Sequence, residues 1–190
     1  PAQVSSRDVE IPVSGGSIRG RVLAPSTDAK SLMVYYHGGG WVIGNIDDYD
    51  AVGRHLAEVC NSVVVMVDYR KAPEHRFPTP VDDCYAALEW ADNHRTDMNA
   101  VDLPLVVAGD SAGGNLSAVM AIRSRDEGGP KIDLQALIYP VTDGRMGAKS
   151  WGDEDKQLFL TSEIMTFFWE HYADSSQRLN HRASPLLADD

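Results

Sequence analysis

Ser111 stands between two glycines at the point where an apolar run gives way to a helical pattern. It lies in the stretch Val106-Val107-Ala108-Gly109-Asp110-Ser111-Ala112-Gly113-Gly114-Asn115. A serine with a glycine two residues before it and another two residues after it is typical of a nucleophile elbow, a sharp turn from a strand into a helix. The flanking residues must be small because strand, turn and helix approach closely there. The pattern predicts that Ser111 is a nucleophile.

A second glycine-rich turn lies far upstream, at His37-Gly38-Gly39-Gly40-Trp41, directly after the apolar run Ser31–Tyr36. Attack on an ester carbonyl creates an oxyanion, which needs hydrogen-bond donors about 3 Å away. Consecutive glycines after a strand offer backbone N–H groups, and they carry no side chain that would block a substrate. Such an HGGG-type motif supplies part of the oxyanion hole in lipases and esterases. Together, the two motifs predict the machinery of a serine hydrolase.

Nucleotide binding is the main alternative for a glycine-rich loop, and the sequence argues against it. Gly109 and Gly114 have the spacing of a phosphate-binding loop, but Asn115 stands where that loop needs a lysine. A net charge of −11 also disfavours nucleic acid as a partner. The acidic residues Asp47, Asp48 and Asp50 are interpreted as charges at a helix N-terminus, since no calcium-loop spacing follows them. We therefore predict no metal and no other cofactor.

The elements that must position these residues alternate between strand and helix. Two short extended runs, 7–13 and 17–23, predict a β-hairpin. Further strands are expected at 31–36, 62–68, 105–108 and 134–139, and helices after 50, from about 81, after 111 and at 162–172. This alternation predicts an α/β fold with a mostly parallel, doubly wound sheet. The serine turn would then lie at the carboxyl edge of the sheet, where such folds place their sites.

The composition fits one domain with a substantial core, since 43% of the 190 residues are hydrophobic. No apolar run is long enough for a membrane span, and residues 1–10 are too polar for a signal peptide. A cytoplasmic location is expected.

Two of the expected helices show an apolar face. In the first helix it consists of Val52, Leu56, Val59 and Cys60, and in the second of Val81, Cys84, Tyr85, Leu88 and Ala91. Cys60 and Cys84 are therefore predicted to be buried thiols.

Three motifs in consistent order resemble the hormone-sensitive-lipase group (family IV) of α/β-hydrolase esterases. They are residues 37–41, the stretch Asp68-Tyr-Arg-Lys-Ala-Pro-Glu-His75 and residues 109–115, and the resemblance runs from about Val9 to Ala188. It implies that Ser111 is the nucleophile and that the oxyanion hole is formed by Gly38, Gly39, Gly40 and Ala112. The N–H groups of the last three would be the donors, with Gly38 opening the approach.

The same resemblance implies supporting roles around this site. His37 would hold the glycine loop rather than act as the base, and Arg70 and Glu74 would brace the loop after the fourth strand. Trp41 would line the acyl side of a substrate pocket, although core packing is an equal alternative. The aromatic-rich helix at 162–172 has two interpretations as well, a lid or pocket wall and plain core packing.

The resemblance also implies a division of the chain. Residues 1–142 would form the hydrolase core up to the strand after the nucleophile helix, 143–183 part of a helical cap, and 184–190 the start of the return to the core. The helical cap segment that family members carry before the first strand is missing at the N-terminus. After Ser111 the sequence shows one strand where the fold needs two more, so the sheet would be truncated.

A catalytic base for Ser111 is not evident in the sequence. In this fold the order is serine, acid, histidine, and the family places the acid one strand beyond a Ser-Pro-Leu segment, here 184–186. We therefore expect the acid and histidine to lie in a C-terminal part outside this chain and the chain alone to be inactive. Within the chain, Asp143 is the best alternative acid, and His171 and His181 are the only later histidines.

The sequence thus predicts a serine carboxylesterase that hydrolyses small, short-acyl esters through an acyl-enzyme. One alternative is a non-catalytic, receptor-like protein that binds a small ligand in the same pocket. Another is an amidase or formamidase that uses the same serine. The expected protein partners are a second copy, forming a homodimer, or a complementing C-terminal segment.

Overall fold

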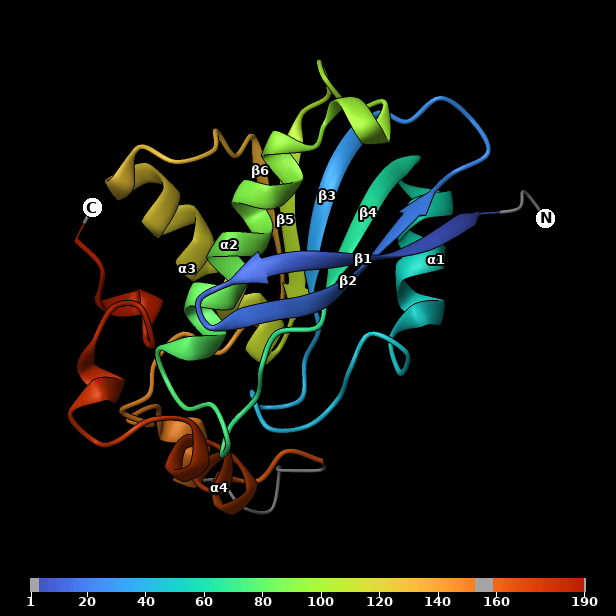
Figure 1. The fold of residues 1–190 in the computed structure, drawn as a ribbon. Coiled ribbons are helices and arrows are strands. Elements are labelled where there is room, and N and C mark those ends of the chain that lie inside the picture. The colour runs from blue at the N-terminus through green and yellow to red at the C-terminus, as the bar shows by residue number, and fades with distance from the viewer. Residues whose placement is uncertain (1–3, 153–158, 190) are drawn as a thin grey trace.

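The computed structural model describes residues 4–152 and 159–189, which form one six-stranded sheet with helices on both faces (Figure 1). The order of strands across the sheet is β1-β2-β4-β3-β5-β6. Strands β4, β3, β5 and β6 are mutually parallel, whereas β2 is antiparallel to both of its neighbours, β1 and β4. The strands are β1 (Ser5–Val13), β2 (Gly16–Ala24), β3 (Ser31–Tyr36), β4 (Ser62–Val67), β5 (Leu105–Asp110) and β6 (Leu134–Ile138). This arrangement confirms the predicted α/β fold with a mostly parallel, doubly wound sheet.

In the described ranges, four α-helices accompany the sheet: α1 (Asp50–Val59), α2 (Thr79–Asn93), α3 (Ala112–Glu127) and α4 (Ser162–Tyr172). Helices α2 and α3 cover one face and α1 covers the other, while α4 lies beyond the lower end of the sheet in Figure 1. Short 3-10 turns occupy Thr96–Met98, Lys149–Gly152, Gln177–Leu179 and Pro185–Leu187. None of the helices in the described parts of the chain combines the length and apolar character that crossing a membrane requires.

The predicted hairpin is confirmed. Strands β1 and β2 pair from Ser5 opposite Ala24 to Val13 opposite Gly16, and a two-residue turn at Ser14 and Gly15 joins them. Gly15 has φ +84°, a backbone conformation that glycine adopts without strain.

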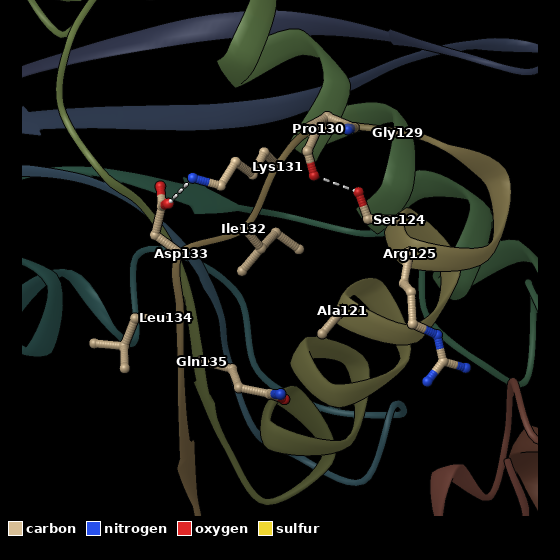
Figure 2. A pocket seen from close by; sticks show the side chains of 10 residues that line it. All are labelled: Ala121, Ser124, Arg125, Gly129, Pro130, Lys131, Ile132, Asp133, Leu134 and Gln135. Carbon is tan, nitrogen blue, oxygen red and sulfur yellow. Dashed lines mark hydrogen bonds and ion pairs between the residues drawn. The ribbon is translucent and has the colours of Figure 1, made fainter. Parts of the chain in front are cut away.

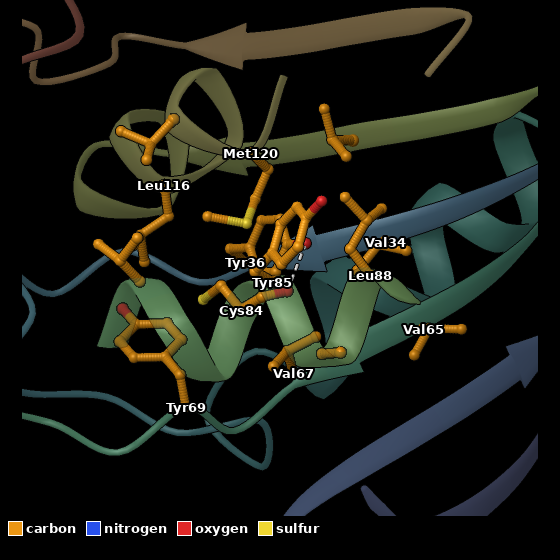
Figure 3. Close-up of a cluster of buried hydrophobic side chains, with 14 of the residues drawn as sticks. Val34, Tyr36, Val65, Val67, Tyr69, Cys84, Tyr85, Leu88, Leu116 and Met120 are labelled. Atoms are coloured by element: carbon orange, nitrogen blue, oxygen red, sulfur yellow. Dashed lines mark hydrogen bonds between the residues drawn. The ribbon is translucent and has the colours of Figure 1, made fainter. Parts of the chain in front are cut away.

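The main core lies between the sheet and helices α2 and α3 (Figure 3). Continuous apolar runs in β3, β4 and β5 are buried on both faces, as expected for central parallel strands. The predicted apolar face of α2 is confirmed, because all five of its residues are buried. Helix α2 begins at Thr79, so Pro80 lies in its first turn, where a missing N–H is harmless, rather than in the preceding loop.

The predicted apolar face of α1 is wrong. Val52 and Val59 are 41% and 66% exposed, and the helix packs on the sheet through Gly53 and Ala57. A Cβ atom at Gly53 would collide with Met66 on the sheet, so close approach of helix and sheet selects the small residues. Cys60, which follows the helix, is consequently exposed and not the buried thiol that we predicted, whereas Cys84 is buried as expected.

Of the three acidic residues interpreted as charges at the N-terminus of the first helix, Asp50 lies in the first turn of α1 as expected, whereas Asp47 and Asp48 need correction. Asp47 and Asp48 lie outside the helix, and their N–H groups are taken by the side chain of Asn45 at 2.8 and 3.1 Å. Asp47 instead pairs with Arg19 and Arg21 of β2, so it ties this loop to the sheet.

Candidate active site

The turn between β5 and α3 places Ser111 in a strained backbone conformation, with φ +53° and ψ −115°. A non-glycine residue rarely adopts such angles unless its surroundings enforce them. Two close approaches do so here: a Cβ at Gly109 would collide with the backbone of Gly113, and one at Gly113 with the carbonyl of Tyr36. The two glycines are therefore required by packing, which is the physical basis of the serine pattern in the sequence.

The end of β6 holds Ser111 in place from the other side. The Ser111 N–H donates to the carbonyl of Ile138 at 2.9 Å, and the Val141 N–H donates to the Ser111 carbonyl at 3.2 Å. The Ser111 side chain is half-buried and makes no hydrogen bond to any described residue. The backbone is thus fixed, while the hydroxyl is not engaged by any residue that the structure describes.

The glycine loop after β3 lies at the same edge of the sheet, because β3 pairs with β5 up to Tyr36 opposite Gly109. Gly39 and Gly40 have φ values of +111° and +58°. A Cβ at Gly39 would collide with the carbonyl of Ile43, and one at Gly40 with the ring of Phe168 from α4. Each glycine is therefore required for a separate reason.

Several backbone N–H groups at this edge have no acceptor among the described residues, and three of them are the expected oxyanion donors. These three belong to Gly39 and Gly40 in the loop and to Ala112, the first residue of α3. The N–H groups in the first turn of a helix lack intrahelical partners and lie at the positive end of its dipole. The three groups are accordingly free to bind an anionic oxygen.

Gly38 differs from the two glycines that follow it. Its N–H donates to Asp110 Oδ1 at 3.0 Å, so this group is already occupied. A Cβ at Gly38 would collide with the Asp110 carboxylate and with the Tyr49 hydroxyl. Gly38 therefore serves to bring the loop against Asp110 and offers no free donor.

His37 is buried and holds the loop. Its Nδ1 donates to the Gly38 carbonyl at 2.6 Å, its ring stacks on Tyr69 with centroids 4.5 Å apart, and the Tyr69 hydroxyl donates to its carbonyl. Burial lowers the pKa of His37, and Nε2 has no partner in the described residues. A neutral, enclosed imidazole of this kind suits the structural role that the resemblance implies.

Trp41 is fully buried and packs among aromatic side chains. It has φ +60°, stacks on Tyr172 with centroids 4.2 Å apart, and lies 4.7 Å from the ring of Trp169. Of its two expected roles, the described residues show core packing and no exposed pocket wall. The helix α4 is anchored by the same contacts, while its Phe167 remains 50% exposed.

Two of the three internal candidates for a catalytic acid and base are engaged by other groups. Both carboxylate oxygens of Asp143 bind Arg145, at distances between 2.8 and 3.1 Å, and the hydrogen bond from Arg145 lowers the pKa of Asp143. His171 lies on α4, where its Nδ1 donates to the Phe167 carbonyl at 2.8 Å. His181 is exposed. None of the three binds Ser111.

In the loop after β4, Arg70 reaches the buried carboxylate of Asp83 on α2 through Nε at 2.9 Å and Nη2 at 2.6 Å. It braces this loop as expected. Glu74, by contrast, is exposed and makes no hydrogen bond or ion pair to a described residue.

Comparison with known proteins decides the family. The family model of the alpha/beta hydrolase fold matches residues 33–190, which is most of the chain. The chain belongs to the α/β-hydrolase fold family. This confirms the family resemblance that the three motifs indicated.

Individual relatives of this α/β-hydrolase are esterases by name. Carboxylic ester hydrolase LipN of Mycobacterium tuberculosis is 41% identical over 98% of this chain and 52% of LipN. Carboxylesterase NlhH of the same species is 39% identical over 83% of this chain and 50% of NlhH. A hyperthermophilic esterase from the archaeon Pyrobaculum calidifontis superimposes with a TM-score of 0.92 at 40% identity, over 100% of this chain and 63% of that chain. The chain spans about half the length of the curated relatives that it matches.

A cavity of about 610 Å³ in this α/β-hydrolase lies away from Ser111, beside the last turns of α3 and the start of β6 (Figure 2). The Ser124 hydroxyl in its wall donates to the Pro130 carbonyl, and Lys131 pairs with Asp133 at 2.9 Å. Its walls hold neither the serine turn nor the glycine loop. The cavity is therefore not the candidate active site.

Sequence reasoning missed two polar residues at the site. Asp110 occupies the variable position of the serine motif, and its contacts reach residues far away in the chain. Asn115, fully buried on α3, donates from Nδ2 to the carbonyls of Val141 at 2.7 Å and Ala183 at 2.9 Å. In the sequence, Asn115 could have been noticed only as a polar residue in the first turns of a helix whose other residues are small and apolar.

Proposed function

We propose that this chain carries the nucleophile and the oxyanion hole of a serine carboxylesterase that acts on short-acyl esters. The observation that carries the proposal is the set of free N–H groups of Gly39, Gly40 and Ala112 at the sheet edge where the strained Ser111 stands. Free donors beside a serine hydroxyl suit the oxyanion of a tetrahedral intermediate. The names of the relatives, carboxylic ester hydrolase and carboxylesterase, support the same chemistry.

In the proposed reaction, Ser111 Oγ bonds to the carbonyl carbon of the ester while a histidine takes the hydroxyl proton. The carbonyl oxygen becomes an oxyanion and is bound by the three free N–H groups. The bond to the alcohol then breaks, the alcohol leaves with the proton held by the histidine, and Ser111 remains acylated. Water attacks the acyl group by the same route, which releases the acid and returns a proton to Ser111.

The environment of the glycine loop supports a preference for short acyl groups. The ring of Phe168 lies so close to Gly40 that even a methyl group there would overlap it. Behind the loop, Trp41 is sealed among Trp169 and Tyr172. An acyl chain bound next to the oxyanion donors would meet the ring of Phe168, so the proposal includes faster turnover of acetyl and butyryl esters than of octanoyl esters.

The acid and the base of the triad belong to the same proposal, and we assign them to residues outside the described part of the chain. The free Ser111 hydroxyl and the pairing of Asp143 with Arg145 support this assignment. So does the coverage of only about half of each curated relative. The division into a core up to residue 142, a partial cap at 143–183 and a return at 184–190 is proposed with it; residues 153–158 of that cap lie outside the described residues.

The test compares the 190-residue chain with the protein as encoded by its gene, using p-nitrophenyl acetate, butyrate and octanoate. We expect the encoded protein to hydrolyse the two short esters fastest and Ser111→Ala to abolish turnover. The 190-residue chain should show Ser111-dependent turnover only when imidazole is added as an external base, with Ser111→Ala giving the imidazole background. Full turnover by the 190-residue chain without imidazole would contradict our assignment of the acid and the base to residues outside the described part of the chain.

The same proteins distinguish catalysis from ligand binding. A serine hydrolase reacts covalently with a fluorophosphonate at its nucleophile, whereas a receptor-like protein does not. Labelling of the encoded protein that disappears in Ser111→Ala would support the esterase. Absence of labelling together with saturable ester binding would favour the receptor-like alternative instead.

A further inference from the structure

Asp110 is a buried carboxylate that pairs with no cation in the described residues. It ends β5, directly precedes Ser111 and is only 8% exposed. Burying a charge is unfavourable unless hydrogen bonds replace the lost water. Asp110 receives three such bonds, all from uncharged groups: the Tyr35 hydroxyl at 2.7 Å, the Gly38 N–H at 3.0 Å and the Tyr49 hydroxyl at 3.2 Å.

The three donors come from three different segments. Tyr35 belongs to β3, Gly38 to the glycine loop, and Tyr49 immediately precedes α1. Oδ1 accepts from Tyr35 and Gly38, and Oδ2 accepts from Tyr49. One side chain next to the serine therefore fixes the end of β3, the start of the glycine loop and the start of α1 relative to each other.

The bond to Gly38 has a direct consequence for the oxyanion loop. The N–H of Gly38 is held by Asp110 and its carbonyl by His37, so both peptide groups of this residue are fixed. Gly39 and Gly40, whose N–H groups are free, follow immediately. The position of those two groups relative to Ser111 thus depends on the hydrogen bond between the Gly38 N–H and Asp110.

We propose that Asp110 is a positioning residue that sets the distance between the Ser111 nucleophile and the oxyanion donors of Gly39 and Gly40. The inference rests on the proposed esterase function. Oxyanion donors stabilise the transition state only at hydrogen-bond distance from the developing charge. Loss of the hydrogen bond between Asp110 and Gly38 should therefore lower kcat and leave KM nearly unchanged.

The inference separates hydrogen bonding from charge. A negative charge beside an oxyanion hole is electrostatically unfavourable for the oxyanion, so the carboxylate acts here through its acceptor geometry. An asparagine at this position keeps an acceptor for the Gly38 N–H and the Tyr35 hydroxyl. Asp110→Asn should accordingly preserve the function that Asp110→Ala removes.

The experiment measures kcat and KM for p-nitrophenyl butyrate in the protein as encoded by its gene. For Asp110→Ala we expect kcat to fall about 10- to 100-fold with KM within about threefold of wild type. Affinity for a trifluoromethyl ketone, which forms a hemiketal oxyanion on the serine, should fall by the same factor. Asp110→Asn should stay within about threefold of wild type in both measurements.

The matched control is Asp83→Ala. Asp83 is also buried and also accepts three hydrogen bonds, but all come from Arg70 in the loop after β4. This variant should lose thermal stability and retain kcat. Equal losses of kcat in Asp83→Ala and Asp110→Ala would overturn the inference, as would an Asp110→Asn protein as impaired as Asp110→Ala.

A second measurement does not depend on catalysis. Amide hydrogen exchange in the peptide covering residues 37–44 should become faster in Asp110→Ala and not in Asp83→Ala. If Asp110→Ala does not fold, the double variant Tyr35→Phe/Tyr49→Phe, which leaves the carboxylate with one donor, takes its place and should show a smaller fall in kcat. Unchanged exchange would refute the positioning role, whereas a wild-type protein that hydrolyses no ester would refute only the proposed function.

Discussion

Trp41 and Tyr172 stack face to face, with ring centroids 4.2 Å apart and ring planes 6° from parallel. Trp41 directly follows the glycine loop, and Tyr172 is the last residue of α4. Both rings are fully buried. This contact therefore anchors α4 to the segment that carries the proposed oxyanion donors.

Replacing Tyr172 tests this anchor. Tyr172→Ala should reduce the free energy of unfolding by about 3 to 5 kcal/mol, because it removes a large ring from a packed aromatic cluster. Tyr172→Phe should raise it by about 1 kcal/mol, because the buried Tyr172 hydroxyl has no hydrogen-bond partner in the described residues. Urea unfolding of both variants gives the two values. Phe167→Ala, which removes a half-exposed ring from the same helix, is the control and should have a much smaller effect.

Alanine at Gly40 should destabilise the protein for a reason that a second substitution can relieve. The new methyl group would overlap the ring of Phe168, and the φ of +58° adds about 1 to 2 kcal/mol of backbone strain. In Gly40→Ala/Phe168→Ala the overlap is gone, so the double variant should be less unstable than the sum of the single variants. Thermal and urea unfolding of the four proteins measures this coupling.

Gly39 provides the contrast, because its new methyl group would meet the backbone carbonyl of Ile43. No side-chain truncation removes that obstacle. Gly39→Ala should therefore show no coupling to Phe168→Ala. Coupling at both glycines, or at neither, would mean that Phe168 does not confine the loop as described.

A cluster of ion pairs on β1, β2 and the loop before α1 should make stability fall in acid. Arg21 contacts Asp8 at 2.7 Å, Asp47 at 2.8 Å and Asp50 at 3.0 Å. The hydrogen bond from Arg21 lowers the pKa of Asp8, and the bond from Arg19 lowers that of Asp47. Because the pKa is lower in the folded state, the unfolded chain binds protons first. The stabilisation is complete above about pH 5 and is lost as pH falls through the folded-state values below 3.8.

Substitution of Arg21 should flatten this dependence. Urea unfolding of Arg21→Met between pH 7 and pH 3 should show a smaller loss of stability than wild type, mostly through reduced stability at neutral pH. The control is Arg7→Met, since Arg7 is exposed on β1 and forms no ion pair with a described residue. An Arg21→Met curve parallel to wild type over this range would contradict the assignment.

The two cysteines should differ sharply in reactivity. Cys60 is exposed, whereas Cys84 is buried and its burial raises the pKa of its thiol well above the usual range. Only the thiolate reacts with iodoacetamide, so the native protein should be labelled once, at Cys60, and Cys60→Ser should abolish labelling. Denaturation should expose the second thiol. Native labelling at Cys84 would show that α2 opens from the sheet.

The elements that sequence reasoning located well are those fixed by local pattern. Apolar runs gave β3, β4 and β5, and helical periodicity gave the buried face of α2, because central strands and a large apolar face leave a strong imprint on composition. The serine turn was equally visible, since the steric collisions at Gly109 and Gly113 exclude every other residue there.

The features that escaped prediction depend on contacts between distant residues. In α1 the buried face is made by Gly53 and Ala57, because the distance between helix and sheet, and not hydrophobicity, decides which side packs. The role of Asp110 depends on hydrogen bonds from Tyr35, Gly38 and Tyr49, and the spacing of these residues in the sequence does not indicate that they share an acceptor. Hydrophobic periodicity predicts which face of a single element is buried, whereas a site such as the surroundings of Asp110 is formed by residues from several elements.

Asn115 has a consequence for how this molecule could be rebuilt. Its amide group binds the carbonyls of Val141 and Ala183, so two segments that lie far apart in the sequence meet at one side chain on α3. A stretch of a relative exchanged between these two positions would therefore have to bring both carbonyls within reach of this amide group. It would also have to replace the ring contacts of Trp169 and Tyr172 with Trp41, which join α4 to the main core.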